Sequence, residues 1–187
     1  VIQVEAGDKT GYALVDPDKD GKGQIYAWGA GDVQQLGSNT TQSSYAIPVV
    51  KKDGTPLDNI VSISAGDLHC LALDANGYVW AWGHGSWGGL TGIGYNESHW
   101  DPRMVVGGET GSPYLKAKAI SAGQGFSMAV TIDGKAVAWG NNGDSGTDPS
   151  GGNLGNGTDA GSLTPVYIRT AANSPITNVI NISDGDT

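Results

Sequence analysis

Three aspartates at alternate positions form the most metal-like pattern in this chain of 187 residues. Asp16, Asp18 and Asp20 stand directly before Gly21 in the pattern D-x-D-x-D-G. Alternate carboxylates on a loop turned by glycine can direct several oxygens to one hard cation, which suits Ca²⁺. The helix-flanked calcium loop also needs a glutamate at its twelfth position, where this chain has Ala27, so that loop type is excluded. The pattern predicts either a calcium-binding hairpin loop or an acidic, solvated turn.

A glycine-rich loop at residues 84–102 concentrates aromatic side chains. Aromatic residues on such loops commonly anchor a partner, and they are equally suited to cover the gap between neighbouring structural units. A second long polar segment, residues 141–164, is also a candidate, because long loops without regular structure tend to be functional or mobile. The first loop predicts a site for a protein or glycan ligand that consists of Trp87, Tyr95, His99 and Trp100.

The sequence contains none of the patterns that usually mark a catalytic site. Its histidines, His69, His84 and His99, form no H-x-x-x-H pair and no set with a cysteine. There is no G-x-S-x-G motif, and no glycine-rich phosphate loop ends in G-K-S or G-K-T. The acidic residues stand in turns, and no pair is placed to hold one raised and one lowered pKa. We therefore expect that the protein is not an enzyme.

The single cysteine, Cys70, cannot form an internal disulfide. His69 precedes it, but successive residues of a strand point to opposite faces, so the imidazole cannot easily activate the thiol. We expect Cys70 to be a buried small residue, because free cysteine packs as a small hydrophobe.

Short strands must position these residues. The stretch 63–83 reads I-S-A-G-D-L-H-C-L-A-L-D-A-N-G-Y-V-W-A-W-G. Its two apolar runs, 70–73 and 78–82, flank a turn whose Asn-Gly pair tolerates the positive φ angles of tight hairpins. The runs are short and bounded by glycine, which predicts a pair of antiparallel strands.

The same stretch recurs along the chain. Its leading glycines are separated by 59, 57 and 62 residues and are Gly7, Gly66, Gly123 and Gly185. The tryptophans of its Trp-Gly pairs are separated by 54 and 57 residues and are Trp28, Trp82 and Trp139. A long period that contains several short strands indicates a repeat architecture.

The spacing also aligns other residues of the repeats. One strand position holds the small residues Gly11, Cys70 and Ser127. In the outer half of each repeat, a leucine is followed after 11 or 12 residues by a proline, which aligns Pro48, Pro102 and Pro165. On this alignment Tyr45 stands opposite His99, and the third repeat carries about seven extra residues within 143–152.

The repeated unit resembles the RCC1 repeat, the blade unit of the regulator of chromosome condensation family. The resemblance rests on the A-G-x-x-H-x-L-A-L run at 65–73, the D-x-x-G turn at 74–77 and the V-x-A-W-G strand at 79–83. It covers nearly the whole chain. His69 belongs to this motif, and we expect it to make a hydrogen bond that holds neighbouring strands.

The resemblance implies an all-β fold of antiparallel four-stranded blades, a partial RCC1-like β-propeller. We expect one repeat domain over 1–187, with repeats at 1–59, 60–118 and 119–178 and the start of a fourth at 179–187. Propellers typically need at least four blades to close. The chain is therefore expected to join the remaining blades of a longer chain, to associate with other copies of itself, or to stand as an open wedge.

Composition limits the partners. The net charge is −9, and the ten basic residues are scattered, which disfavours nucleic acid and anionic membrane surfaces. No apolar run is long enough for a membrane span. The chain has 31 glycines and few lysines, and it is rich in Asn, Thr, Ser and Asp. This composition is typical of an exported bacterial protein, extracellular or at the cell surface.

These observations favour a non-catalytic binding or adhesion module that recognises its ligand through the loops at the blade rims. One alternative is a structural subunit that assembles into a filament or surface lattice through unpaired terminal strands near Val1 and Val179. The resemblance also implies a regulator that exchanges guanine nucleotides on a small GTPase, but the acidic balance argues against a role on chromatin. Fold analogy alone does not decide between these functions.

Overall fold

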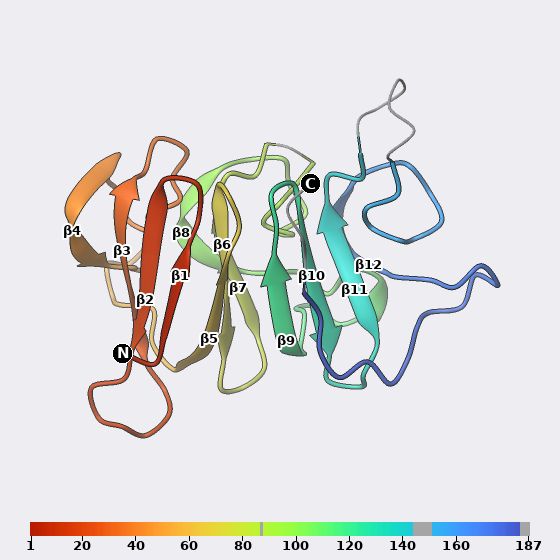
Figure 1. Cartoon of the computed structure of the whole chain (residues 1–187), viewed down its shortest axis with the longest axis horizontal. Helices are drawn as coiled ribbons and strands as arrows, with labels where there is room; N and C mark the ends of the chain where they lie inside the picture. The colour runs from red at the N-terminus through yellow and green to blue at the C-terminus, as the bar shows by residue number, and fades with distance from the viewer. Residues whose placement is uncertain (87, 144–150, 184–187) are drawn as a thin grey trace.

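The computed structural model describes residues 1–86, 88–143 and 151–183, which form three four-stranded sheets that stand side by side (Figure 1). The first sheet holds β1 (Gln3–Ala6), β2 (Thr10–Val15), β3 (Gln24–Ala30) and β4 (Gln42–Pro48). The second holds β5 (Ile60–Ala65), β6 (His69–Asp74), β7 (Val79–Gly83) and β8 (His99–Met104). The third holds β9 (Ala117–Ala122), β10 (Phe126–Thr131), β11 (Ala136–Gly140) and β12 (Ser162–Tyr167).

Each sheet is an antiparallel meander in which every strand pairs with the next strand in sequence. This arrangement confirms the predicted all-β class of four-stranded blades. Helix in the described residues is limited to the single turn η1 (Gly108–Thr110) between the second and third sheets. No described helix has the length and apolar character that crossing a bilayer requires.

The hairpin between β6 and β7 forms as the Asn-Gly pair predicts. Gly77 has a φ of +84°, which favours glycine. Asp74 fixes the turn, because its Oδ1 accepts the backbone N–H groups of Asn76 (2.8 Å) and Tyr78 (2.9 Å). The other carboxylate oxygen accepts the Nε1–H of Trp80 at 3.1 Å, which ties the turn to β7.

The innermost strands bring the sheets together, since β1 contacts β5 and β5 contacts β9. The turns before β2, β6 and β10 approach one another closely at the leading glycine of each repeat. A Cβ on Gly7 would lie 2.6 Å from the carbonyl oxygen of Gly66, and one on Gly66 would lie 2.3 Å from that of Gly123. The Ala-Gly pair therefore recurs because neighbouring blades meet at this point without room for a side chain.

Two buried apolar clusters fill the spaces between the sheets. The cluster between the first and second sheets includes Trp82, whose ring packs edge-on against Tyr12. The cluster between the second and third sheets includes Trp139. Both indoles are fully buried and donate Nε1–H to a backbone carbonyl of the preceding sheet, Trp82 to Gln35 and Trp139 to Leu90, each at 2.9 Å. The recurring tryptophan thus joins one blade to the blade before it.

Strand pairing confirms that a small residue recurs opposite the tryptophan, and the pairs are Gly11–Trp28, Cys70–Trp82 and Ser127–Trp139. Cys70 is fully buried, as expected, and this burial raises the pKa of its thiol well above the usual value.

The outermost strand of the first sheet corrects the predicted repeat alignment. Strand pairing places Ser43, and not Tyr45, at the position that His99 takes in the second sheet. Pro48 is displaced from the position of Pro102 by the same two residues. The physical reason is that the connection before β4 is two residues shorter than the one before β8, while the strand pairs keep one geometry.

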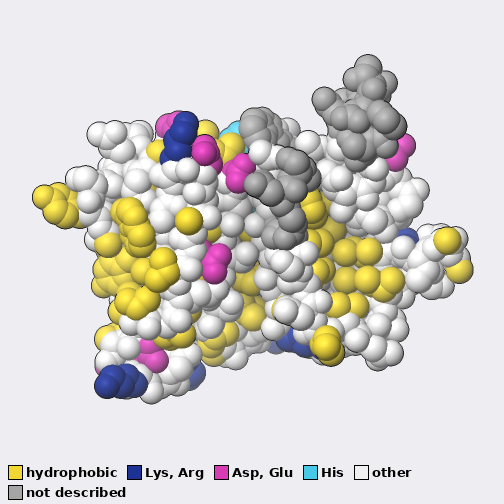
Figure 2. All heavy atoms as spheres, viewed as in Figure 1, with side chains coloured by type: hydrophobic (Ala, Val, Ile, Leu, Met, Phe, Trp, Pro, Cys, Tyr) yellow, Lys and Arg dark blue, Asp and Glu magenta, His cyan; other side chains and the backbone are white. Residues whose placement is uncertain are grey.

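The first sheet leaves one face without a neighbouring sheet among the described residues. Trp28 occupies on β3 the place that Trp82 and Trp139 occupy in the later blades. Its ring lies over Gly11, where an added Cβ would clash with the indole. Figure 2 shows hydrophobic side chains gathered over the first and third sheets.

The fourth repeat is predicted to begin at residue 179. Residues 179–183 form no strand, and residues 184–187 lie outside the described residues. The backbone N–H of Val179 donates to the carbonyl of Gly134 at 2.9 Å, as that of Ala117 donates to Gly77 at the start of the third blade. Ile182 packs against the apolar cluster of the third sheet. The described residues that follow the third sheet are therefore docked on it, and a fourth repeat stays a prediction.

Candidate binding surfaces on the rims of the blades

The connections between strands form two rims. The loop rim, at the upper edge in Figure 1, carries the connections β3–β4, β7–β8 and β11–β12, of which residues 31–41, 84–86, 88–98, 141–143 and 151–161 are described. The turn rim, at the opposite edge, carries the hairpins β2–β3, β6–β7 and β10–β11 and the links from one sheet to the next. A partner that approaches the ends of the blades meets one of these rims.

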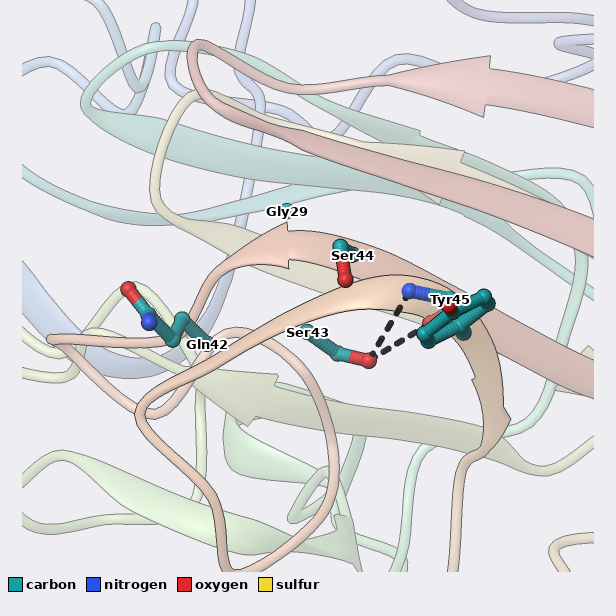
Figure 3. A pocket seen from close by; sticks show the side chains of 5 residues that line it. All are labelled: Gly29, Gln42, Ser43, Ser44 and Tyr45. Carbon is teal, nitrogen blue, oxygen red and sulfur yellow. Dashed lines mark hydrogen bonds between the residues drawn. The ribbon is translucent and has the colours of Figure 1, made fainter.

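A hollow of about 500 Å³ lies beside strand β4 at the outer edge of the first sheet (Figure 3). Its lining residues are Gly29, Gln42, Ser43, Ser44 and Tyr45. Ser43 Oγ donates to the carbonyl of Tyr45 at 2.7 Å and accepts its backbone N–H at 3.2 Å. None of the lining residues carries a charge, and the Tyr45 side chain is 80% exposed. This hollow is open surface beside an edge strand and presents little to fix a ligand.

A smaller hollow of about 180 Å³ lies on the loop rim between the first and second blades. One wall is Trp100, from β8 of the second blade. The other walls come from the β3–β4 connection of the first blade and consist of Gly31, Asp32, Gln34, Ser38, Asn39, Thr40 and Thr41. We call this feature the Trp100 hollow. It combines an aromatic ring with hydroxyl, amide and carboxylate groups.

Ser38 adds unused hydrogen-bonding capacity to the Trp100 hollow. Its Oγ is buried and has no hydrogen-bond partner within the described residues. A buried hydroxyl without a partner is costly, and in native proteins a water or a ligand usually supplies the missing bond. Because this oxygen is closed to solvent, a ligand in the hollow would instead cover the Trp100 ring and bond to the exposed Asp32, Asn39 and Thr41.

Three of the four residues of the predicted aromatic site are described by the structure, and they have different environments. Trp87 lies outside the described residues. Tyr95 is 57% exposed on the loop but does not line the Trp100 hollow. His99 begins β8, is 3% exposed and has its Nδ1 2.8 Å from the carbonyl oxygen of Asp101. The placement of His99 on a loop is therefore corrected, because alternation along β8 turns it inward, and of the three described residues Trp100 alone lines the hollow.

His69 makes a hydrogen bond, as its motif predicts, but the bond joins two blades and not neighbouring strands of one sheet. Its Nε2 lies 2.7 Å from Ser127 Oγ in the third blade. Ser127 uses its single proton toward the carbonyl of Leu90 at 2.9 Å, so it must accept the Nε2–H of His69. Burial lowers the pKa of His69 from 6.5 to about 3, which keeps the ring neutral. This histidine is thus a neutral donor that joins two blades.

The aspartate loop folds as a self-bonded turn. The Asp16 carboxylate accepts the backbone N–H groups of Asp20 (3.3 Å) and Gly21 (2.9 Å), and Asp20 accepts that of Lys22 (2.9 Å). Asp18 and Asp20 line a polar hollow of about 330 Å³, but Asp16 does not. In the described part of the chain, no three His, Cys, Asp or Glu side chains are grouped to hold a metal. Calcium binding stays a prediction. It requires the Asp16 carboxylate to give up its hydrogen bonds from the backbone N–H groups of Asp20 and Gly21 and to bind the cation instead.

If the loop binds Ca²⁺, the cation is expected to raise the melting temperature relative to chelator. Binding to the folded state alone stabilises by about 2.7 kcal/mol at a hundredfold excess over the dissociation constant. The combined variant Asp16→Asn, Asp18→Asn and Asp20→Asn keeps similar turn geometry and should lose the calcium effect. Equal melting temperatures of the natural chain in calcium and in chelator would identify the loop as an ordinary acidic turn.

Sequence reasoning missed the polar half of the Trp100 hollow. Residues 38–41 read S-N-T-T, which is ordinary turn composition. They face Trp100 only because the blades pack side by side, and the shorter connection before β4 shifts their alignment with the second repeat. The spacing of the repeats could have indicated that residues 38–41 of the first blade lie beside Trp100 of the second.

Comparisons with known proteins agree with this architecture. The sequence model of the "Regulator of chromosome condensation (RCC1) repeat" matches residues 22–73 and 76–130, and a second model of the same description matches 117–145. Human WBSCR16 has a similar fold with a TM-score of 0.68 at 22% identity, over 91% of this chain and 40% of that one. These matches confirm that the three sheets are blades of an RCC1-type β-propeller.

Two further similarities concern proteins with described partners or activities. The ultraviolet-B receptor UVR8 of Arabidopsis thaliana is 32% identical over 118 residues, which are 63% of this chain and 25% of the receptor. Yeast RCC1 (Prp20), solved with Kap60 bound to it, has a TM-score of 0.65 at 20% identity, over 91% of this chain and 37% of the yeast chain. The chain thus spans a quarter of the receptor and about two fifths of the solved propellers.

Proposed function

Because the chain belongs to the RCC1 repeat family, we propose that it is a non-catalytic module that binds a protein partner through its loop rim. Yeast RCC1 (Prp20), which shares the fold, binds the protein Kap60. The buried histidines His69 and His99 make contacts inside and between blades, which supports a structural role for them. The faces between neighbouring blades are filled by buried apolar clusters, so recognition at those junctions is left to the rims.

The main support for this proposal is the Trp100 hollow. It places a large ring among the exposed polar side chains of Asp32, Asn39 and Thr41 at a junction of two blades. Tryptophan is enriched among the residues that dominate interface energies, and its contribution is largest where a partner removes the ring from water. A loop from a partner protein that inserts a side chain here would cover the ring and bond to these polar groups.

The proposal extends to an adhesion role in an exported bacterial protein and to a glycan as an alternative ligand. Its support is the composition, with few lysines and many glycine and small polar residues. The relatives named above come from a plant, human and yeast, and they add nothing to this part of the proposal.

The open face of the first sheet supports association with further blades, either from a longer chain or from another copy. Trp28 lies there at the position from which Trp82 and Trp139 reach the preceding blade. A blade in front of Trp28 would accept its indole N–H through the carbonyl that corresponds to Gln35 and Leu90.

The loop-rim proposal predicts that Trp100→Ala weakens binding of ligands to this chain. Peptides selected on the natural chain from a random phage-displayed library provide the probes, and their dissociation constants are measured by fluorescence anisotropy. We expect Trp100→Ala to weaken the best binders at least about tenfold, or about 1.4 kcal/mol, because it removes one wall of the hollow. Ser38→Ala should weaken them less.

Tyr45→Ala is the matched control, because it removes an exposed ring from the other hollow on the loop-rim side. It should leave the dissociation constants unchanged, and melting curves of all variants should coincide. Binders that tolerate Trp100→Ala as well as they tolerate Tyr45→Ala would place recognition elsewhere and contradict the proposal.

A further inference from the structure

The turn rim between the second and third blades carries a second surface that neither the family nor the sequence patterns identify. Two adjoining hollows of about 280 and 180 Å³ share Ser112 and Lys116 in their linings. The side chains that define this surface are Tyr78, Tyr114, Lys116, Ile132, Lys135 and Tyr167. We call it the tyrosine–lysine surface.

Backbone pairing between the blades fixes the centre of this surface. Lys116 precedes β9 and forms a bridge with Tyr78, which precedes β7. Its Nζ lies 4.6 Å from the centroid of the Tyr78 ring, and its carbonyl accepts the backbone N–H of Ile132 at 3.2 Å. The ammonium group is therefore held in place by a cation–π contact and does not swing freely in solvent.

The charges of this surface leave cations in excess. Its acidic neighbours are already paired, Asp133 with Lys135 at 2.8 Å and Glu109 with Arg169 at 2.7 Å. Lys116 has no carboxylate within 4 Å among the residues that the structure describes, and neither does the exposed Lys118.

Lys118 belongs to the same surface. Its Nζ would lie 3.8 Å from a Cβ on Gly134, in the hairpin that borders the larger hollow. In a chain of net charge −9, two lysines of one short segment without a carboxylate partner form a local exception. Another turn-rim hollow, beside the aspartate loop, is instead mainly acidic, because Asp18, Asp20 and Asp58 line it together with Lys22.

Apolar groups next to these cations are exposed to solvent. The Ile132 side chain is 63% exposed and Tyr114 is 43% exposed. Exposed rings and aliphatic side chains beside fixed charges are the usual composition of a protein-binding patch, in which the apolar contact gives affinity and the charges give orientation.

We propose that the tyrosine–lysine surface is a docking site for an acidic segment of a protein partner. Carboxylates of the segment pair with Lys116 and Lys118, and apolar side chains between them cover Tyr114 and Ile132. The surface lies on the opposite rim from the Trp100 hollow, so this binding does not depend on the loop-rim function.

The test uses a fluorescein-labelled peptide in which glutamates alternate with leucines, and binding to the whole chain is followed by anisotropy. We expect saturable binding that weakens at least about tenfold in the double variant Lys116→Gln and Lys118→Gln, and also in Tyr114→Ala. Binding should fall as salt is raised, because exposed ion pairs are screened. The same peptide with glutamines in place of glutamates should not bind.

The double variant Lys22→Gln and Lys52→Gln is the matched control, since it removes the same charge from exposed lysines elsewhere on the molecule. It should bind the acidic peptide as the natural chain does, and so should Trp100→Ala. The proposal is overturned if the peptide does not bind, if the two lysine pairs have equal effects, or if a uridine oligonucleotide binds more tightly than the peptide through Lys116 and Lys118.

Discussion

Replacing Trp139 with alanine is expected to lower the free energy of unfolding by about 3–5 kcal/mol, a large part of the stability of a domain of this size. The indole is fully buried between the second and third blades. Its Nε1–H donates to the carbonyl of Leu90, so alanine removes both the apolar contact and a hydrogen bond that joins the two blades. Urea unfolding followed by circular dichroism measures the loss.

Two matched variants separate the causes of this loss. Trp139→Phe keeps most of the ring but lacks the N–H donor, and the Leu90 carbonyl keeps the Ser127 hydroxyl at 2.9 Å as its other partner. We therefore expect Trp139→Phe to cost about 1–2 kcal/mol. Trp28→Ala removes the same residue type from the same repeat position on the open face, and it should cost well under half of the Trp139→Ala loss.

An equal loss for Trp28→Ala and Trp139→Ala would contradict this account. It would mean that the tryptophans stabilise each blade from within and not through the contact between blades. Repeat proteins gain much of their stability from interfaces between neighbouring units, which is why the two positions are expected to differ.

The inner part of each blade could be predicted from the sequence because its turns fix the strand register. The Asn-Gly pair before Tyr78 allows a tight hairpin, and the shared spacing from Gly66 to Trp82 and from Gly123 to Trp139 leaves no room for a shift. The place of His69 in the motif predicted a structural hydrogen bond, but not that the bond crosses from one blade to the next.

The outer strands were harder to predict, because the connection before them varies in length. The connection before β4 is two residues shorter than the connection before β8. The amino-acid composition of the two loops does not reveal this difference. His99 reads as a loop residue for the same reason. Its burial becomes visible only when β8 is known to begin at that residue, so that His99 and Asp101 point inward.

The candidate surfaces depend on contacts between blades that no single repeat encodes. Trp100 faces residues about sixty positions earlier, and Lys116 lies beside Tyr78 and Ile132 from two different blades. Single lysines and tyrosines in turns carry no distinctive pattern. Only the side-by-side packing of the sheets brings them into one surface.

Acid is expected to destabilise the chain from about pH 6.5 downward, and His69 is expected to contribute a large part of this effect. Burial lowers the pKa of His69 in the folded chain from 6.5 to about 3. The unfolded chain therefore binds one more proton between these two values, and folding stability rises with pH in that window. The contribution of the neutral ring is fully present above pH 6.5 and is lost as the pH falls, by about 1.4 kcal/mol per pH unit.

The variant His69→Gln isolates this contribution. Glutamine keeps an N–H donor for Ser127 Oγ but does not titrate, so the slope of unfolding free energy against pH should be smaller by about 1.4 kcal/mol per unit between pH 6 and pH 4. Burial also lowers the pKa of His84 and His99, which act in the same direction in both proteins and cancel in the difference.

Aspartates with lowered pKa values, Asp53 and Asp133, cancel in the same way. Urea unfolding at a series of pH values gives the two slopes. Parallel slopes for His69→Gln and the natural chain would show that the imidazole is not held neutral between the blades.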